Sequence, residues 1–378
     1  MAYTLLVLII GTNLPSPLYG VYQHRFGFGP LVVTLIFAAY AAALVPALLL
    51  AGPLADAIGY RRVLVPAVLL AAGGTVLFAF ADTTGWLFAA RAVQGLAVGA
   101  GSGALTAALV TTEPSGDQHR ASLLASTMTT AGGGVGPVLA GLLAQYLPAP
   151  TTLCYLVEIA LLAPALVAVA ALPGRLGASG QPWRPRVPHV PAAARGPFAA
   201  AAVVSFLAWA VTALFLTLVP SSLSTLTGSH NLAVAGLAAG LILLSAAAVQ
   251  AFAQQWPASR TQPVGLVLLV TGLAALVLTN LAASPALLLI SAVIAGAGQG
   301  LAFMGALRQA NAAGQGHAGV ISAFYIATYL GVGVPVVGVG LLAAPLGLGT
   351  AVDIFAAVIS SCCLATGLWL RRSDTQAH

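Results

Sequence analysis

The stretch Gly52-Pro-Leu-Ala-Asp56-Ala-Ile-Gly59-Tyr-Arg61-Arg62 lies between two long apolar runs, 31–51 and 63–81. Each run has about 20 residues, which is the length of an α-helix that crosses a hydrocarbon core about 30 Å thick. The glycines permit a tight connection, and Asp56 can pair with a cation or a helix N-terminus. We therefore expect a short polar turn between two membrane-spanning helices.

The composition extends this interpretation to the whole chain. Of the 378 residues, 60% are hydrophobic and only 5% are charged, whereas a soluble domain has about 25% charged residues. The mean hydropathy is +1.02. These values exclude a soluble globular protein and a disordered chain, and they indicate a protein that crosses the membrane many times.

Twelve apolar runs are long enough to span a bilayer. We interpret the first as a spanning helix and not as a cleaved signal peptide. The runs are 2–22, 31–51, 63–81, 86–112, 121–146, 153–172, 198–220, 233–254, 264–282, 286–307, 319–343 and 351–370.

The basic residues predict the orientation. All 13 are arginines, and arginine gathers on the cytoplasmic side of membrane proteins. With a cytoplasmic amino terminus, Arg25 alone falls outside and Arg91 falls within a helix. The others fall inside: Arg61, Arg62, Arg120, Arg175, Arg184, Arg186, Arg195, Arg260, Arg308, Arg371 and Arg372. We expect a multi-pass protein of the inner (plasma) membrane with both termini in the cytoplasm, and no nucleic-acid partner.

The segment 173–197 is rich in proline and arginine. Proline at this density cannot continue a helix, and the polarity of the segment keeps it out of lipid. It predicts a cytoplasmic linker between an N-terminal six-helix bundle, 1–172, and a C-terminal six-helix bundle with a short tail, 198–378. The halves also share sequence, since Gln94-Gly-Leu-Ala recurs as Gln299-Gly-Leu-Ala. Such repeats are typical of transporters.

The stretch 52–64 resembles the hallmark motif of the major facilitator superfamily. It keeps Gly52, Leu54, Ala55, Asp56, Gly59, Arg61 and Leu64. It departs at Ala57 and Tyr60, where the family often has arginines. The resemblance implies an all-α membrane fold of two pseudo-symmetric six-helix bundles, in which Gly52, Asp56, Gly59 and Arg61 latch one conformational state. The alternative is a positively charged turn without a coupling role.

The fourth run, with Arg91, Gln94 and Gly95, is similar to a second family motif that is linked to proton movement. An arginine inside a spanning helix is unfavourable unless it faces protein or water. The alternative is that Arg91 reaches to the outer membrane surface.

The fifth run resembles the antiporter motif of the same family through Gly132, Gly136, Pro137 and Gly141, with Ala140 in place of one glycine. Small residues let helix backbones approach closely, and the proline allows a bend. In the family this motif marks exporters. The alternative is helix packing without any effect on the direction of transport.

The first run contains Asn13-Leu-Pro15-Ser-Pro17-Leu-Tyr19. Two prolines bend or open a helix and free backbone carbonyls. The pattern resembles the first helix of twelve-helix drug/proton antiporters. A kinked packing helix is the alternative.

Two acidic residues, Glu158 and Asp353, lie in or beside the hydrocarbon, where carboxylates mark proton pathways. Arg91 and Glu158 share a depth of roughly 7–8 Å, so they would pair if their helices face each other. We therefore consider Arg91, Glu158 and Asp353 for proton coupling. The alternative is that Glu158 is satisfied locally, because the resemblance places its helix at the periphery.

Other chemistry is not supported by the sequence. The cysteines lack metal or disulfide spacing, the histidines lie in loops or tails, and Ser179 lacks the context of a nucleophile. We expect no enzyme activity, no cofactor and no metal.

The predicted function is proton-driven export of small amphipathic or hydrophobic molecules by a monomer that alternates access between its halves. The partners are the substrate, protons and the lipid bilayer. Expected substrate-binding residues are Asn13, Tyr19, Tyr40, Arg91, Gln94, Trp209, Thr212, Gln299 and Tyr325. Alternatives are an exporter or facilitator of one metabolite without proton coupling, a receptor or scaffold without transport, and an intramembrane enzyme.

Overall fold

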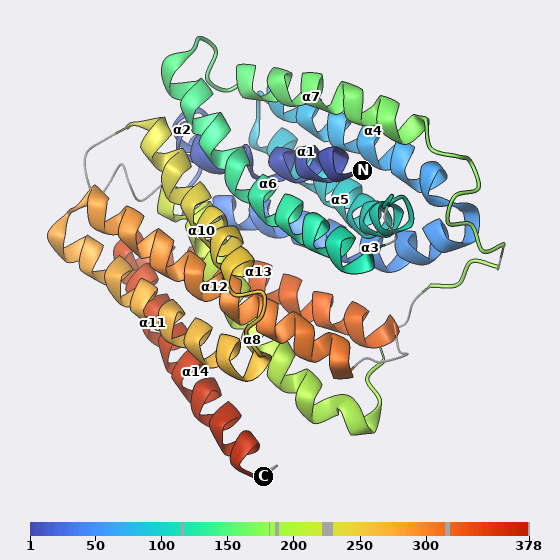
Figure 1. Cartoon of the computed structure of the whole chain (residues 1–378). Helices are drawn as coiled ribbons and strands as arrows, with labels where there is room; N and C mark the ends of the chain where they lie inside the picture. Colours follow the sequence, from blue (N-terminus) through green and yellow to red (C-terminus); the bar gives the residue numbers. More distant parts are fainter. Residues whose placement is uncertain (115–116, 181, 186–188, 221–229, 314–317, 377–378) are drawn as a thin grey trace. The chain divides into compact units, whose positions relative to one another are not determined.

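The computed structural model describes residues 1–114, 117–180, 182–185, 189–220, 230–313 and 318–376. Long α-helices contain most of these residues, and no strand occurs among them (Figure 1). Within the described part, 11 spans have the length and apolar composition needed to cross a membrane. The helix α6 (Gln118–Tyr146) adds a further 29-residue helix. The expected all-α membrane fold is confirmed.

The chain divides into two compact units, and most helices belong wholly to one of them. The first unit is Met1–Phe28 with Ile36–Arg186, and the second is Gly29–Leu35 with Val187–His378. The first contains α1 (Ala2–Asn13), α2 (Tyr19–Phe26), most of α3 (Pro30–Ile58), α4 (Tyr60–Ala79), α5 (Thr84–Thr111), α6 and α7 (Leu153–Ala170). The second contains α8 (Arg195–Thr217), α10 (Leu232–Phe252), α11 (Ala258–Ala282), α12 (Pro285–Ala313), α13 (Ala318–Leu346) and α14 (Leu348–Gln376).

The first span is interrupted where its prolines lie. The α-helical part α1 ends at Asn13, a short 3-10 turn covers Ser16–Leu18, and α2 begins at Tyr19. Proline has no backbone N–H, so Pro15 cannot bond the carbonyl four residues earlier, at Gly11. The interruption therefore leaves polar backbone groups available inside the first unit.

Glycines bring helices into close contact in both units. A Cβ atom at Gly95 or Gly99 of α5 would collide with the α3 backbone. In the second unit, a Cβ at Gly296 or Gly300 of α12 would collide with the α10 backbone in the same way. The two units thus use equivalent small-residue packing, as the repeated Gln-Gly-Leu-Ala sequence indicates.

The connection between α3 and α4 differs from the polar turn predicted at Gly52–Arg62. The α3 helix continues to Ile58, and α4 begins at Tyr60. Only Gly59 breaks the helical path, with a φ of 97° that favours glycine. Asp56 therefore lies in the last turn of a helix, and the break between the two predicted helices is confined to Gly59, which makes it shorter than the predicted turn.

Residues 173–180, which we call the strap, pack on this connection. The backbone N–H of Tyr60 donates to the Leu176 carbonyl at 3.0 Å, and the N–H of Ser179 donates to the Asp56 carbonyl at 2.7 Å. Helix ends leave such backbone groups without partners inside the helix. The strap thus satisfies the end of α3 and the start of α4 together. The cytoplasmic location of this segment and the domain limits 172 and 198 stay predictions.

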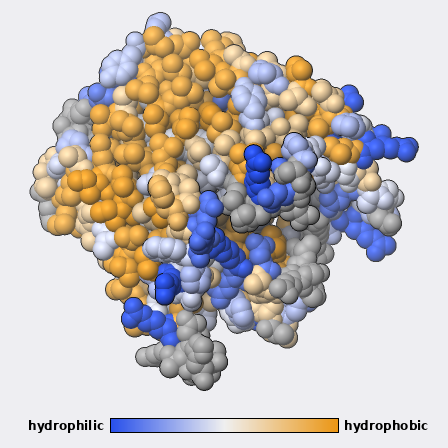
Figure 2. Space-filling view, viewed as in Figure 1, coloured by the Kyte–Doolittle hydropathy of each residue, from blue (hydrophilic) through white to orange (hydrophobic). Residues whose placement is uncertain are grey.

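The outer surface is rich in apolar side chains. Figure 2 shows broad hydrophobic areas on the visible face. Large side chains such as Phe80, Val167 and Phe252 are exposed. Contiguous exposed apolar surface is uncommon in soluble monomers, and here it fits contact with lipid.

Candidate functional site

Arg91 of α5 is buried in the first unit, with 1% of its surface exposed. Its Nε donates a hydrogen bond to the Tyr19 hydroxyl at 2.7 Å. Its Nη1 donates to the Thr12 carbonyl and, at 3.2 Å, to Gln94 Oε1. The guanidinium group therefore faces protein and does not extend toward the membrane surface.

Aromatic rings surround the same guanidinium group. The Arg91 Cζ atom lies between 5.5 and 5.9 Å from the ring centroids of Tyr19, Phe37, Tyr40 and Phe78. The faces of aromatic rings attract cations, more strongly when water is excluded. Within the described chain no carboxylate pairs with Arg91. Rings and neutral oxygens thus offset its charge, and its Nη2 has no partner there.

Gln94 connects Arg91 to the interrupted first span. Its Oε1 accepts from Arg91, while its Nε2 donates to the Gly11 carbonyl at 3.1 Å. This carbonyl is the one that Pro15 leaves without its helical partner. The proline, the glutamine and the arginine therefore form one local arrangement, which explains why these residue types occur together.

Glu158 of α7 is the other buried charge of the first unit, with 1% of its surface exposed. A Cβ atom added at Gly11 would lie 2.7 Å from its Oε1, so Gly11 makes room for the carboxyl group. Its Oε2 has no hydrogen-bond partner among the described residues. The side chain points into the unit, and the proposed role of Glu158 in proton coupling stays a prediction.

A small cavity lies beside Glu158 and Gln94. Its volume is about 10 Å³, close to the minimum for one water molecule. The lining residues are Leu8, Gly11, Thr12, Ala71, Thr75, Gln94, Val98 and Glu158. The direct pairing of Arg91 with Glu158 considered from the sequence is not formed, since Arg91 bonds Gln94 and Glu158 meets the cavity.

A second polar and aromatic cluster lies in the second unit, on α8, α12 and α13. The Trp209 ring meets the Phe303 ring edge-on at 5.6 Å, and Phe303 stacks on Phe324 at 6.1 Å. Gln299 lies one helical turn before Phe303 on α12, hence on the same face. In the described structure neither Trp209 Nε1 nor Gln299 Oε1 has a hydrogen-bond partner.

The two glutamines of the repeated sequence differ in their partners. Gln94 Oε1 accepts from Arg91, three residues before it. The residue three before Gln299 is Gly296, which packs against the α10 backbone. The second unit therefore has no cation at this position, and Gln299 keeps an unpaired acceptor.

The other predicted substrate-binding residues lie in varied settings. Asn13 donates to Thr12 Oγ1 at 3.1 Å, close to the Arg91 cluster. Tyr325 is half-buried and meets Phe324 edge-on at 5.8 Å. Thr212 is buried, and its hydroxyl donates to the Ala208 carbonyl of its own helix at 3.0 Å. Asp353 is half-buried on α14 of the second unit.

The predicted conformational residues belong to two helix junctions. Gly52 and Asp56 lie in α3, Arg61 is exposed in α4, and Gly59 lies between them. On α6, a Cβ at Gly132 would lie 2.7 Å from the Leu6 carbonyl, and one at Gly136 would collide with the Ile10 carbonyl. Pro137 and Gly141 lie buried in the same helix.

Several residues of these clusters were not predicted. Phe37, Phe78 and Phe303 lie in apolar runs, where a phenylalanine looks like any other core or lipid-facing residue. A spacing of three or four residues from a predicted residue was the available signal, because Phe37 precedes Tyr40 and Phe303 follows Gln299 on one helix face. The described residues contain no group of three potential metal ligands.

Comparisons with known proteins show the family and the fold of the chain. Residues 1–338 match the Major Facilitator Superfamily. A stretch of 149 residues is 34% identical to the puromycin resistance protein pur8 of Streptomyces alboniger, covering 39% of this chain and 29% of that protein. The crystal structure of a mutant of the nucleoside transporter NupG superimposes with a TM-score of 0.74 at 14% identity, covering 97% of each chain, which shows a shared fold.

Proposed function

The chain belongs to the Major Facilitator Superfamily, and on this premise we propose that it exports small amphipathic or hydrophobic compounds in exchange for protons. The observation that carries the proposal is the pair of buried clusters, one in each unit, that combine aromatic rings with unpaired polar atoms. Apolar, aromatic walls with few polar groups suit ligands of varied structure. Alternating access between two repeats is the transport mode that such a fold supports.

Glu158 is the proposed proton carrier. It is an acid buried among apolar helices, it has an unpaired oxygen, and its cavity is close to the minimum volume for one water molecule. Intramembrane acids of this kind mark proton pathways. Gln94 lies between the Glu158 carboxyl group and the Arg91 cluster, because it lines the same cavity as Glu158 and accepts a hydrogen bond from Arg91.

Export, as opposed to uptake, is supported by two observations. The α6 stretch with Gly132, Gly136 and Pro137 resembles the antiporter motif, and its glycines pack directly on α1. The relative from Streptomyces alboniger is named for resistance to puromycin, which fits removal of a toxic compound. We further propose a monomer of the inner membrane with both termini in the cytoplasm, on the distribution of arginines.

Proteoliposomes test the function directly. Purified protein would be reconstituted with an imposed pH gradient, and proton flux would be recorded for a panel of compounds that includes puromycin. The proposal expects compound-dependent proton flux and accumulation against the compound gradient. Downhill movement without proton flux would instead show a facilitator, and no movement of any compound would contradict the proposal.

A further inference from the structure

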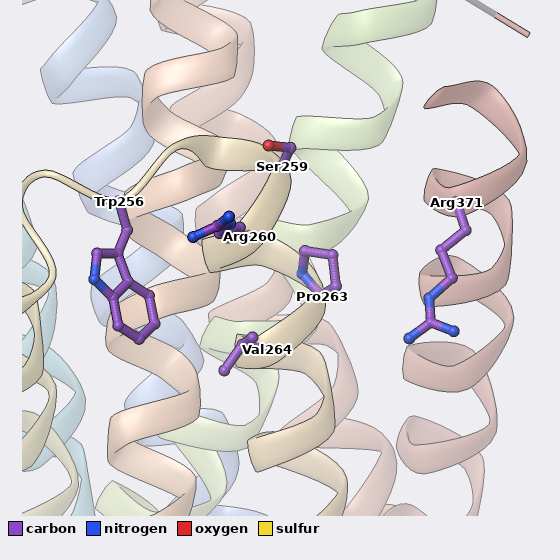
Figure 3. A pocket seen from close by; sticks show the side chains of 6 residues that line it. All are labelled: Trp256, Ser259, Arg260, Pro263, Val264 and Arg371. Atoms are coloured by element: carbon purple, nitrogen blue, oxygen red, sulfur yellow. The ribbon is translucent and has the colours of Figure 1, made fainter. Parts of the chain in front are cut away.

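A surface hollow of about 470 Å³ lies in the second unit, and its lining shares no residue with either buried cluster. Its lining residues are Trp256, Ser259, Arg260, Pro263, Val264 and Arg371. They come from the start of α11, the residues just before it and the end of α14. Figure 3 shows Trp256 on one side and Arg371 on the other, with Pro263 and Val264 between them.

The hollow combines two positive charges with an apolar floor. Arg260 and Arg371 supply guanidinium groups, whose planar N–H donors match the oxygens of a phosphate group. Pro263 and Val264 offer no polar side chain, so a purely ionic ligand would leave this floor unused.

Two hydrogen bonds from Arg308 hold the backbone of the connection between α10 and α11. Arg308 of α12 donates from Nη1 to the Trp256 carbonyl at 2.7 Å and from Nη2 to the Gln254 carbonyl at 2.6 Å. This two-pronged contact fixes the short connection between α10 and α11. The position of Trp256 therefore follows from packing within the unit.

The apolar floor continues along both helices. On α11, Val264 and Val267 follow Arg260 at helical spacing, and both are exposed. On α14, Leu364 and Leu368 precede Arg371 at helical spacing, and both are exposed. The helices pack on each other, since the Leu266 side chain lies against Gly367. Each helix thus has an arginine at the hollow and a row of exposed aliphatic side chains that extends from it along the helix.

We propose that this hollow binds an anionic phospholipid, with its phosphate between Arg260 and Arg371 and its acyl chains along the exposed rows of α11 and α14. Basic pockets at the ends of membrane helices recognise anionic headgroups, and tryptophan favours the membrane–water interface. The aliphatic rows favour a lipid over a free phosphate ion, which would use the arginines alone. The proposal does not depend on which compound is transported.

Thermal unfolding of the full chain in a neutral detergent tests the site. Dioleoyl-phosphatidylglycerol should raise the unfolding temperature of the wild type, whereas the same amounts of dioleoyl-phosphatidylcholine or of inorganic phosphate should not. The variant Arg260→Gln/Arg371→Gln should lose this increase. Each arginine removed should weaken lipid binding about fivefold. The matched control is Arg195→Gln, which removes an exposed arginine of the same unit and should respond like the wild type.

Three results would overturn the proposal. The first is an equal response of the double variant and the wild type, which means unspecific lipid binding. The second is stabilisation by inorganic phosphate as large as by the lipid, which means a free-anion site. The third is the absence of bound phosphatidylglycerol in native mass spectra of the wild type, a measurement that does not require any variant to fold.

Discussion

Single residues define where a ligand would meet polar groups in this protein. Each polar atom of Gln94 has a partner, because its Oε1 accepts from Arg91 and its Nε2 donates to the Gly11 carbonyl. Gln299, its counterpart in the repeat, keeps a buried Oε1 without a partner in the described structure. Unpaired buried acceptors are unfavourable, so a ligand that donates a hydrogen bond has more to gain at Gln299.

Replacing Gln299 by leucine separates stability from binding. The free energy of unfolding should change by less than about 1 kcal/mol, because no hydrogen bond to Oε1 is lost. Ligand affinity should fall roughly threefold to tenfold for compounds that donate a hydrogen bond. Thermal unfolding and equilibrium binding check the two parts. Thr212→Val is the control, since that hydroxyl already bonds its own helix, and equal affinity loss in both variants would contradict the assignment.

At the scale of helices, glycines let the backbones of two helix pairs in the first unit come into direct contact. In the first unit α6 contacts α1 through Gly132 and Gly136, and α5 contacts α3 through Gly95 and Gly99. No side chain separates the backbones at these points. Each pair therefore packs at a distance that a single larger residue would change.

Gly136→Leu should abolish transport. The leucine side chain would meet the Ile10 carbonyl of α1, and overpacking of this kind lowers stability by about 1–3 kcal/mol. The matched control is Gly73→Leu on α4, where a Cβ meets no atom within 4 Å. Export measured at equal expression checks both variants. Wild-type export by a folded Gly136→Leu protein would show that the close contact is dispensable.

The strap yields a second prediction at this scale. Gly177 has a φ of 77°, and a Cβ there would collide with the Tyr60 ring. Gly177→Val should therefore lower the free energy of unfolding by about 1–3 kcal/mol and expose the strap to proteases. Gly174→Val is the control, because its Cβ has open space and its φ is not positive. Equal protease resistance of both variants would show that the strap does not depend on this contact.

Across the whole molecule, the proposed proton exchange rests on Glu158. Glu158→Gln should abolish accumulation against a gradient while downhill exchange of the compound continues, since the amide fits the same space but carries no titratable proton. Arg91→Ala should abolish accumulation as well, and the double variant should be no worse than either single one. Paired flux assays in proteoliposomes, with and without a pH gradient, measure this. Continued accumulation by Glu158→Gln would make the residue structural.

The sequence predicted the membrane fold well because the length of the apolar runs depends on the bilayer and not on tertiary contacts. Three of the predicted substrate-binding residues, Arg91, Gln94 and Tyr19, lie together in the structure, and their role in binding stays a prediction. The sequence could not establish whether Arg91 meets Glu158, because a shared depth leaves the rotation of each helix open. It located the break between α3 and α4 within the right stretch but made it too long, because helix-breaking residue types such as Pro53 lie within a continuous helix.

The strap also bears on how the protein is made. Residues 173–180 follow α7 directly, so a ribosome delivers them before it translates any codon of α8. The hydrogen bonds of the strap to the Asp56 carbonyl and to the Tyr60 N–H can thus form before the second unit exists. A gene divided for co-expression as two polypeptides should be cut after codon 185, which keeps these hydrogen bonds and the bond from Trp183 Nε1 to the Leu50 carbonyl on the first product. A cut after codon 172 would place the strap on the second polypeptide, so that the first could form these hydrogen bonds only after the two products associate.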